Sequence, residues 1–132
     1  MDYYKDKQEL TGYLAKIQTY DCEAGQDTET LRKYLIQLTN WMGRANELMA
    51  SYGRLFREQK KAAYLKVFTS LESIGKTQAP SLVKDYVDSL CVESGEMYDL
   101  SVRCSRSCVH TIEAIRSVLS SLKDEIRNIH NH

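Results

Sequence analysis

The fold of this chain is decided by the stretch from Leu31 to Ala63, LRKYLIQLTNWMGRANELMASYGRLFREQKKAA. Apolar or small residues recur in it at alternating spacings of four and three, and one polar residue, Gln59, joins the series. The series comprises Leu31, Leu35, Leu38, Met42, Ala45, Met49, Tyr52, Phe56, Gln59 and Ala63. A heptad repeat of this kind keeps one face of a helix against a partner helix along its whole length. The stretch therefore predicts a long helix in an all-α fold.

A second apolar series makes this face wider than the seam of a two-stranded coiled coil. It precedes part of the first series by one position and comprises Tyr34, Trp41, Leu48, Leu55 and Ala62. A face this wide needs two or more partner helices, and a short N-terminal helix can cover some of it. We expect Tyr34, Trp41, Leu48 and Leu55 to contribute to an interface between copies, in a dimer or a larger oligomer. A monomeric three-helix bundle is the alternative.

The chain divides into three predicted helices, at residues 2–20, 28–73 and 82–129, within a single domain of 132 residues. A short turn joins the two long helices, so we expect an antiparallel helical hairpin, assembled into an oligomeric helical bundle. Each long helix would measure roughly 65–70 Å. Gly53 and Gly95 are the positions at which these helices could bend or break.

The predicted helix ends carry their own signals. Asp27 or Thr28 can cap the second helix, and Pro80 blocks its continuation toward the third. Ser81 can cap the third helix. Beyond Ala63 the apolar stripe changes phase at Tyr64, so we expect the distal part of the second helix to pack on a different partner.

Composition limits the function. The chain has 18 Lys and Arg residues and 18 Asp and Glu residues, so its formal net charge is zero. Proteins that grip nucleic acid are usually basic, so nucleic acid is disfavoured as a partner, although a local basic patch remains compatible with the balance. Near-zero charge also removes a barrier to self-association.

The sequence carries no export or membrane signal that we recognise. The N-terminus is polar, and no uninterrupted apolar stretch approaches the length of a membrane span. We therefore expect a cytoplasmic protein without membrane contact. Its cysteines, Cys22, Cys91, Cys104 and Cys108, would be free thiols in a reducing compartment.

No residue pattern predicts catalysis. Cys104 and Cys108 are four apart with His110 close in sequence, but on a helix His110 points away from both thiols. This geometry disfavours a metal site and an activated nucleophile, and favours small buried thiols. No phosphate loop, nucleophile elbow or di-metal carboxylate pattern occurs. We expect a protein that is not an enzyme and binds neither a metal nor another cofactor.

Two groups of basic residues are candidates for binding an anion. Arg103, Arg106 and His110 share one face of the third predicted helix, and arginine forks suit phosphate. The acidic residues on that face are Glu96, Asp99 and Glu113. A charge-laced solvated surface, with Asp99 and Arg103 at ion-pair spacing, is therefore the alternative.

The second group is the densest basic stretch of the chain. It comprises Arg54, Arg57, Lys60, Lys61 and Lys66, with Glu58 the one acid among them. Arg54, Arg57, Lys60 and Lys61 could meet the phosphates of a nucleotide or a nucleic acid, or could form a solubilising face. Lys60, beside Gln59, could also mark a polar layer in the bundle or a ligand cavity.

Two segments carry a resemblance to known proteins. They are WMGRANELMASYGRLF (residues 41–56) and YDLSVRCSRSCVHTIEAIRSVLSSLKDEIR (residues 98–127). In its overall pattern of residue types the chain resembles small helical coil-containing proteins encoded in phage genomes. This resemblance implies a phage accessory protein in the infected bacterial cytoplasm. Such proteins include recombination accessories and counter-defence proteins, some of which are oligomeric sponges that sequester nucleotide immune signals.

Three functions follow from these observations. The first is a non-catalytic oligomer that sequesters an anionic small ligand, a nucleotide immune signal in the reading that the resemblance favours. The second is a helical scaffold or inhibitor that binds a host protein through its helix faces. The third is a recombination accessory factor that binds nucleic acid.

Overall fold

A computed structural model describes residues 1–20, 27–74 and 79–131 and places nearly all of them in helices. The helices are α1 (Tyr3–Thr19), α2 (Thr28–Ile74), α3 (Pro80–Leu90) and α4 (Val92–His130). No β-strand occurs within the described ranges. The prediction of an all-α fold is confirmed.

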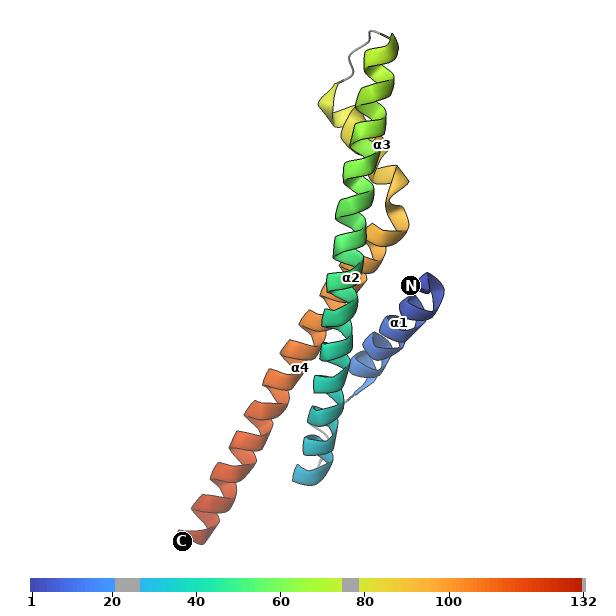
Figure 1. Ribbon diagram of the computed structural model, residues 1–132. Helices are drawn as coiled ribbons and strands as arrows, with labels where there is room; N and C mark the ends of the chain where they lie inside the picture. Colours follow the sequence, from blue (N-terminus) through green and yellow to red (C-terminus); the bar gives the residue numbers. More distant parts are fainter. Residues whose placement is uncertain (21–26, 75–78, 132) are drawn as a thin grey trace.

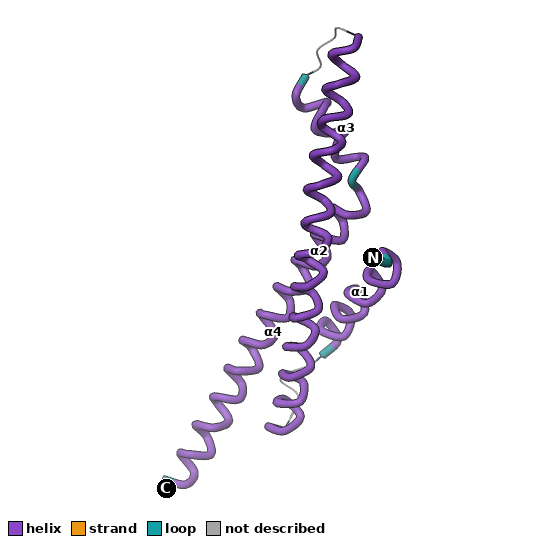
Figure 2. Tube along the Cα trace, viewed as in Figure 1, coloured by secondary structure: helices purple, strands orange, loops and turns teal. Residues whose placement is uncertain are grey.

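The long helices α2 and α4 form the body of the molecule. They run in opposite directions and pack against each other over most of their length (Figure 1). Helix α1 packs mainly on α4 and also touches α2, whereas α3 packs on the distal end of α2. The tube trace in Figure 2 shows the short non-helical segment that separates α3 from α4.

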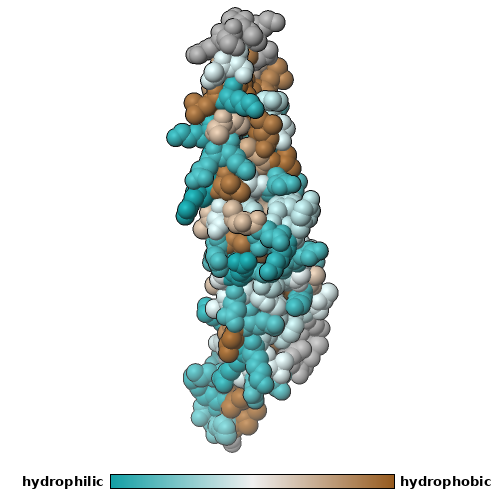
Figure 3. All heavy atoms as spheres, turned by 45° about the vertical axis from the view of Figure 1, so that its right-hand side comes forward, coloured by the Kyte–Doolittle hydropathy of each residue, from teal (hydrophilic) through white to brown (hydrophobic). Residues whose placement is uncertain are grey.

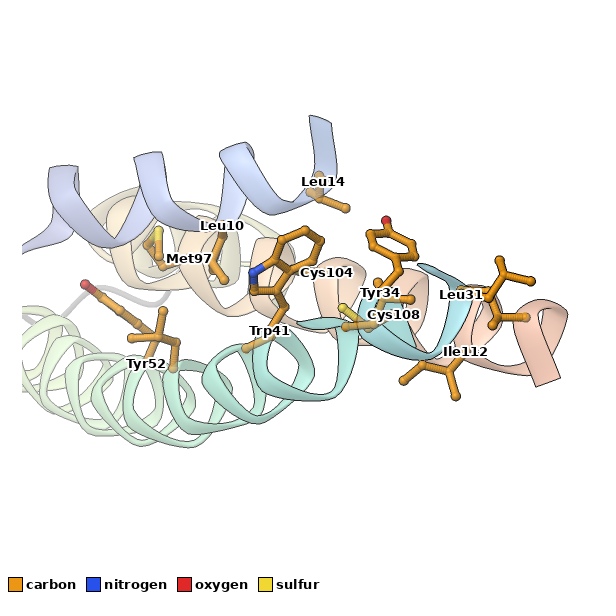
Figure 4. Close-up of a cluster of buried hydrophobic side chains, with 14 residues drawn as sticks. Leu10, Leu14, Leu31, Tyr34, Trp41, Tyr52, Met97, Cys104, Cys108 and Ile112 are labelled. Atoms are coloured by element: carbon orange, nitrogen blue, oxygen red, sulfur yellow. The ribbon is translucent and has the colours of Figure 1, made fainter. Parts of the chain in front are cut away.

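The main core lies where α1, α2 and α4 meet. Helix α2 contributes fully buried members of the heptad series, including Leu31, Leu38 and Ala45. Figure 4 shows Leu10 and Leu14 approaching from α1, and Met97, Cys104, Cys108 and Ile112 from α4. The heptad prediction is confirmed at these positions, since one continuous face of α2 is buried.

The second apolar series of α2 is buried within the single chain. Tyr34, Trp41 and Leu48 are 8%, 7% and 3% exposed. The indole ring of Trp41 points toward α1 and stacks on Tyr13 at 5.1 Å between ring centroids (Figure 4). Leu55 is half-buried against the same core. The sequence predicts these side chains at an interface between copies; within the chain, Tyr13 of α1 stacks on Trp41, and Tyr20, directly after α1, stacks on Tyr34 at 3.6 Å.

The N-terminal cap of α2 is one that the sequence predicted, whereas the start of α3 differs from the prediction. The Asp27 carboxylate accepts a hydrogen bond from the backbone N–H of Thr30 at 2.7 Å, and hydrogen bonds from Thr30 lower its pKa. Helix α3 begins at Pro80, with Ala79 at the N-cap position and no side-chain cap. The prediction of Ser81 as a cap is therefore wrong, because proline at the first helical position needs no N–H partner.

The third predicted helix is in fact two helices. They are separated at Cys91, whose φ of −120° and ψ of 25° leave the helical region, and the Cys91 N–H donates to the Asp88 carbonyl at 3.1 Å. The separation lets Val83 and Val87 of α3 pack on Ala63 and Tyr64 of α2 in a small second core. A different partner for the distal part of α2 was expected from the phase change at Tyr64, and α3 is that partner.

Gly53 of α2 and Gly95 of α4 permit close contact between the two helices and break neither of them. A Cβ atom at Gly53 would lie 3.1 Å from the Tyr98 ring, and one at Gly95 would lie 3.1 Å from the Phe56 ring. Each glycine therefore receives an aromatic ring from the opposite helix. This reciprocal fit holds the two backbones near each other in the upper half of the pair.

Candidate ligand groove between α1 and α4

Helix α1 is fixed on α2 by a cluster of charged side chains. The Asp6 carboxylate, 6% exposed, accepts hydrogen bonds from the Tyr52 hydroxyl at 2.7 Å and from Arg44 at 3.3 Å. Arg44 also donates through Nε to Glu9 at 2.6 Å and pairs with Glu47 at 3.2 Å. These contacts join residues far apart in sequence, so periodicity did not reveal them.

The charges of this cluster support one another. The hydrogen bond to Glu9 raises the pKa of Arg44, which stays protonated. Burial, and then the hydrogen bond to Asp6, raise the pKa of the Tyr52 hydroxyl, which therefore remains a donor. The buried carboxylate is thus supplied with two donors, as a buried charge requires. The cluster defines how α1 is placed on α2.

A second contact ties the start of α1 to α4. The Tyr3 hydroxyl donates to the Glu96 carboxylate at 3.0 Å. Partial desolvation and this hydrogen bond raise the pKa of Tyr3. Helix α1 is therefore held to both long helices, and the side of α1 that carries Lys7 and Thr11 lies beside α4.

An open groove of about 440 Å³ runs along this edge. Helix α1 contributes Lys7 and Thr11, and helix α4 contributes the other lining residues. Those are Glu96, Met97, Asp99, Leu100 and Arg103. Side chains that are remote in sequence thus surround a space of the size that small-molecule sites occupy, about 300–1,000 Å³.

The groove carries charges of both signs. Arg103 forms no ion pair with any described residue, and the ion pair with Asp99 suggested by helical spacing is not made. Lys7 lies over the Tyr3 ring at 5.6 Å and is likewise in no ion pair within the described ranges. Two cations are therefore available to an anionic group, while Glu96 and Asp99 can accept hydrogen bonds. Such a groove suits a ligand with both an anionic group and hydrogen-bond donors.

Of the first candidate group, the structure places only Arg103 in the groove. Arg106 and His110 are exposed on α4 and are not among the residues that line it. The groove brings Lys7 and Thr11 to Arg103 instead. Sequence reasoning missed these two residues because their relation to α4 depends on the docking of α1.

The second candidate group is divided by the structure. Arg54, Arg57 and Lys61 are exposed on α2. Lys60 is half-buried, lies 3.8 Å from the Asp88 carboxylate and sits 5.5 Å from the centroid of the Phe56 ring.

Lys60 and Gln59 make polar contacts with the helices that follow α2. Gln59, the residue before Lys60, accepts a hydrogen bond through its side-chain oxygen from the Ser94 hydroxyl at 2.6 Å. Both side chains lie at the edge of the packed helices, since Gln59 is exposed and Lys60 is half-buried. These contacts lie where α2 meets the junction of α3 and α4.

The cysteines that the structure describes are buried thiols. Cys91, Cys104 and Cys108 are free and buried, whereas His110 is exposed, and Cys22 lies outside the described residues. The hydrogen bond with Cys108 and burial raise the pKa of Cys104, so neither chemistry nor exposure favours a reactive thiolate there. Within the described ranges, no three His, Cys, Asp or Glu side chains are grouped as metal ligands.

Comparisons with known proteins add no relative. No family model, no curated protein and no solved structure matches this chain. None of the helices in the described part of the chain combines the length and the apolarity that crossing a membrane requires.

Proposed function

We propose that this protein is a non-catalytic binding protein that captures a nucleotide in the groove between α1 and α4. The observation that supports the proposal is the meeting of Lys7 and Arg103 from two helices, with neither side chain in an ion pair within the described ranges. Arginine and lysine at the two sides of a groove can hold one phosphate between them. Thr11 adds a hydroxyl that can donate to the same phosphate.

The carboxylates of the groove favour a nucleotide over a bare anion. Glu96 and Asp99 would weaken the binding of any phosphate beside Lys7 and Arg103, so a bare anion gains little from the groove. The same carboxylates can accept hydrogen bonds from an amino group on a nucleobase. A nucleotide suits both kinds of side chain in the groove, because its phosphate can bind the cations and its base can donate to the carboxylates.

In this proposal the protein acts by sequestration. The ligand is a nucleotide immune signal, and the protein is a phage-type counter-defence sponge of the infected bacterial cytoplasm. Long antiparallel hairpins would assemble into an oligomer, so that each assembly holds several ligands. The resemblance to small coil-containing phage proteins supports this reading, and the groove supplies the residues for it.

Calorimetric titration of the full chain with nucleotides tests the groove. Cytidine monophosphate should bind more tightly than uridine monophosphate, because cytosine offers an amino donor where uracil offers a carbonyl. Inorganic phosphate should not bind measurably. Arg103→Ala should weaken binding at least about tenfold, since a hydrogen bond to a charged group contributes about 1.5–3 kcal/mol.

Arg106→Ala is the matched control, because it removes an exposed arginine from the same helix but outside the groove. It should leave the affinity for cytidine monophosphate unchanged. Equal losses for Arg103→Ala and Arg106→Ala would move the site from the groove to the outer face of α4. Absence of binding by every nucleotide would refute the proposal.

A second measurement tests sequestration itself. Native mass spectrometry of the protein from signal-producing cells reports the subunit number and any bound small mass together. Release of a nucleotide-sized mass, unchanged after denaturation, supports capture without catalysis. A chemically altered ligand would contradict a non-catalytic role.

The exposed apolar side of α3 favours a second candidate, a scaffold or inhibitor that binds a protein. Leu82, Tyr86 and Leu90 recur at a spacing of four on α3 and are 59%, 56% and 51% exposed. Contiguous exposed apolar side chains often mark protein interfaces. A stoichiometric complex that persists in high salt and is lost in Leu82→Ser, but retained in Ile36→Ser on α2, would favour this function.

A further inference from the structure

One face of α2 joins exposed cations to a pair of aromatic rings, of which Phe68 is exposed and Tyr64 is half-buried against α3. Arg54, Arg57, Lys61, Tyr64 and Phe68 follow one another at spacings of three and four, which places them on one side of the helix. We name these residues the α2 stripe. The stripe runs over fifteen residues, from Arg54 to Phe68, and its ends lie about 21 Å apart along the helix.

The cations of the α2 stripe are available to a partner. Arg54, Arg57 and Lys61 are exposed, and none is in an ion pair with another residue that the structure describes. Lys60, which lies off this face, instead forms an ion pair with Asp88 at 3.8 Å. One acid, Glu58, is exposed nearby. The stripe is thus a local basic patch on a chain whose charges balance overall.

The aromatic end of the α2 stripe presents flat rings next to these cations. Tyr64 and Phe68 stack with centroids 6.0 Å apart and planes inclined by 18°. Phe68 is 52% exposed, and its neighbour Leu65 is 61% exposed. Figure 3 shows hydrophobic and hydrophilic side chains intermixed over the upper part of the molecule.

We propose that the α2 stripe binds single-stranded nucleic acid, with the cations on successive phosphates and an unstacked base on the exposed ring of Phe68, which Tyr64 supports from the core side. Proteins that bind single strands without sequence preference combine a basic track with aromatic platforms in this way. A duplex would bring its phosphates to the cations but would keep its bases inside the stack, so the aromatic end would remain unused. The stripe shares no residue with the groove between α1 and α4 and is independent of nucleotide capture there.

The charge of the stripe predicts how salt acts. Three phosphate contacts should give a slope of about −2 for the logarithm of the association constant against the logarithm of salt concentration, at about 0.7 per contact for single strands. Removing two cations should reduce that slope by about 1.4. An anionic lipid surface would also attract these cations, but it offers no bases that could stack on the aromatic rings.

Fluorescence anisotropy with a labelled oligothymidylate, using the full chain, tests the proposal. The double substitution Arg57→Glu with Lys61→Glu should weaken binding more than tenfold and flatten the salt dependence. Phe68→Ala should weaken binding at least about fivefold, since stacking contributes about 1–3 kcal/mol per base. It should leave the salt slope unchanged, which separates stacking from charge.

Two matched variants control for general effects. Arg106→Glu reverses an exposed charge on α4, and Ile36→Ala removes an exposed apolar side chain from α2, where Ile36 is 64% exposed. Both should keep the affinity within twofold, and circular dichroism should show unchanged helix content for all four variants. Equal losses in the controls would overturn the proposal.

Three other outcomes would also overturn it. The first is no binding of the oligonucleotide at low salt. The second is equal affinity for duplex and single strand, which would leave the aromatic rings without a role. The third is binding to vesicles with anionic lipids together with no binding of the oligonucleotide, which would assign the stripe to a membrane surface.

Discussion

The middle of the molecule and its distal end solve the same packing problem with different numbers of helices. In the middle, α1 packs on the pair of α2 and α4, and the three helices bury the wide apolar face of α2. Leu38 on this face is 0% exposed. At the distal end α2 has only α3 beside it, and the shared core is small. Leu65 and Phe68 therefore stay at the surface there. Where the third helix is missing, apolar side chains become available for binding.

The largest expected effect contrasts leucines of these two regions. Leu38→Ala should lower the free energy of unfolding by about 2–5 kcal/mol, because it leaves a cavity in a closely packed core. Leu65→Ala, at the exposed distal end, should change it by less than about 0.5 kcal/mol. Urea unfolding of the two variants measures both values, and similar losses would mean that the distal end is covered in solution.

The buried charge under α1 gives the next effect. Tyr52→Phe removes a hydroxyl that donates to Asp6 and leaves the carboxylate one donor short, which should cost about 1–3 kcal/mol in unfolding free energy. Tyr86→Phe, on the exposed side of α3, is the control and should be neutral. If the two substitutions had equal effects, Asp6 would not depend on Tyr52 for its stability in the core.

The glycines offer a comparison between crowded and open positions in helices. Gly43→Ala meets nothing within 4 Å and should stabilise the chain by up to about 1 kcal/mol through helix propensity. Gly95→Ala brings a Cβ atom to 3.1 Å from Phe56, so crowding should offset that gain and make this variant about 1–3 kcal/mol less stable than Gly43→Ala. Thermal unfolding by circular dichroism ranks them. Equal gains would show that α2 and α4 are not held as close as the structure has them.

The smallest expected effect is a pH dependence in alkali. The pKa of Tyr52 is raised in the folded chain, mainly by burial, so its folded state holds a proton that the unfolded state loses first. The stabilisation is complete below the unfolded value of about 10 and declines as the pH rises above it. Melting temperatures between pH 9 and 11 should therefore fall more steeply for the wild-type chain than for Tyr52→Phe. Parallel slopes would contradict this assignment.

Sequence by itself determined the features that depend on local pattern. The alternating spacing from Leu31 to Ala63 predicted a single long α2, and α2 runs without interruption past Gly43 and Gly53. Asp27 was one of two residues predicted as the cap of α2, and it is the residue that caps it. The thiols of Cys104 and Cys108 were predicted to be buried and are. These features follow from helical periodicity and from contacts within a few residues, which a sequence displays directly.

Tertiary structure alone decided which faces met. The stacking of Tyr13 on Trp41 covers, within the chain, part of a face that the sequence offered both to the N-terminal helix and to a second copy. The placement of Lys7 beside Arg103 created a groove that neither helix predicts alone. The break at Cys91, rather than at Gly95, follows from the packing of α3 on α2. Such contacts join residues tens of positions apart, and their free energy depends on how whole helices dock, so no local pattern of residue types encodes them.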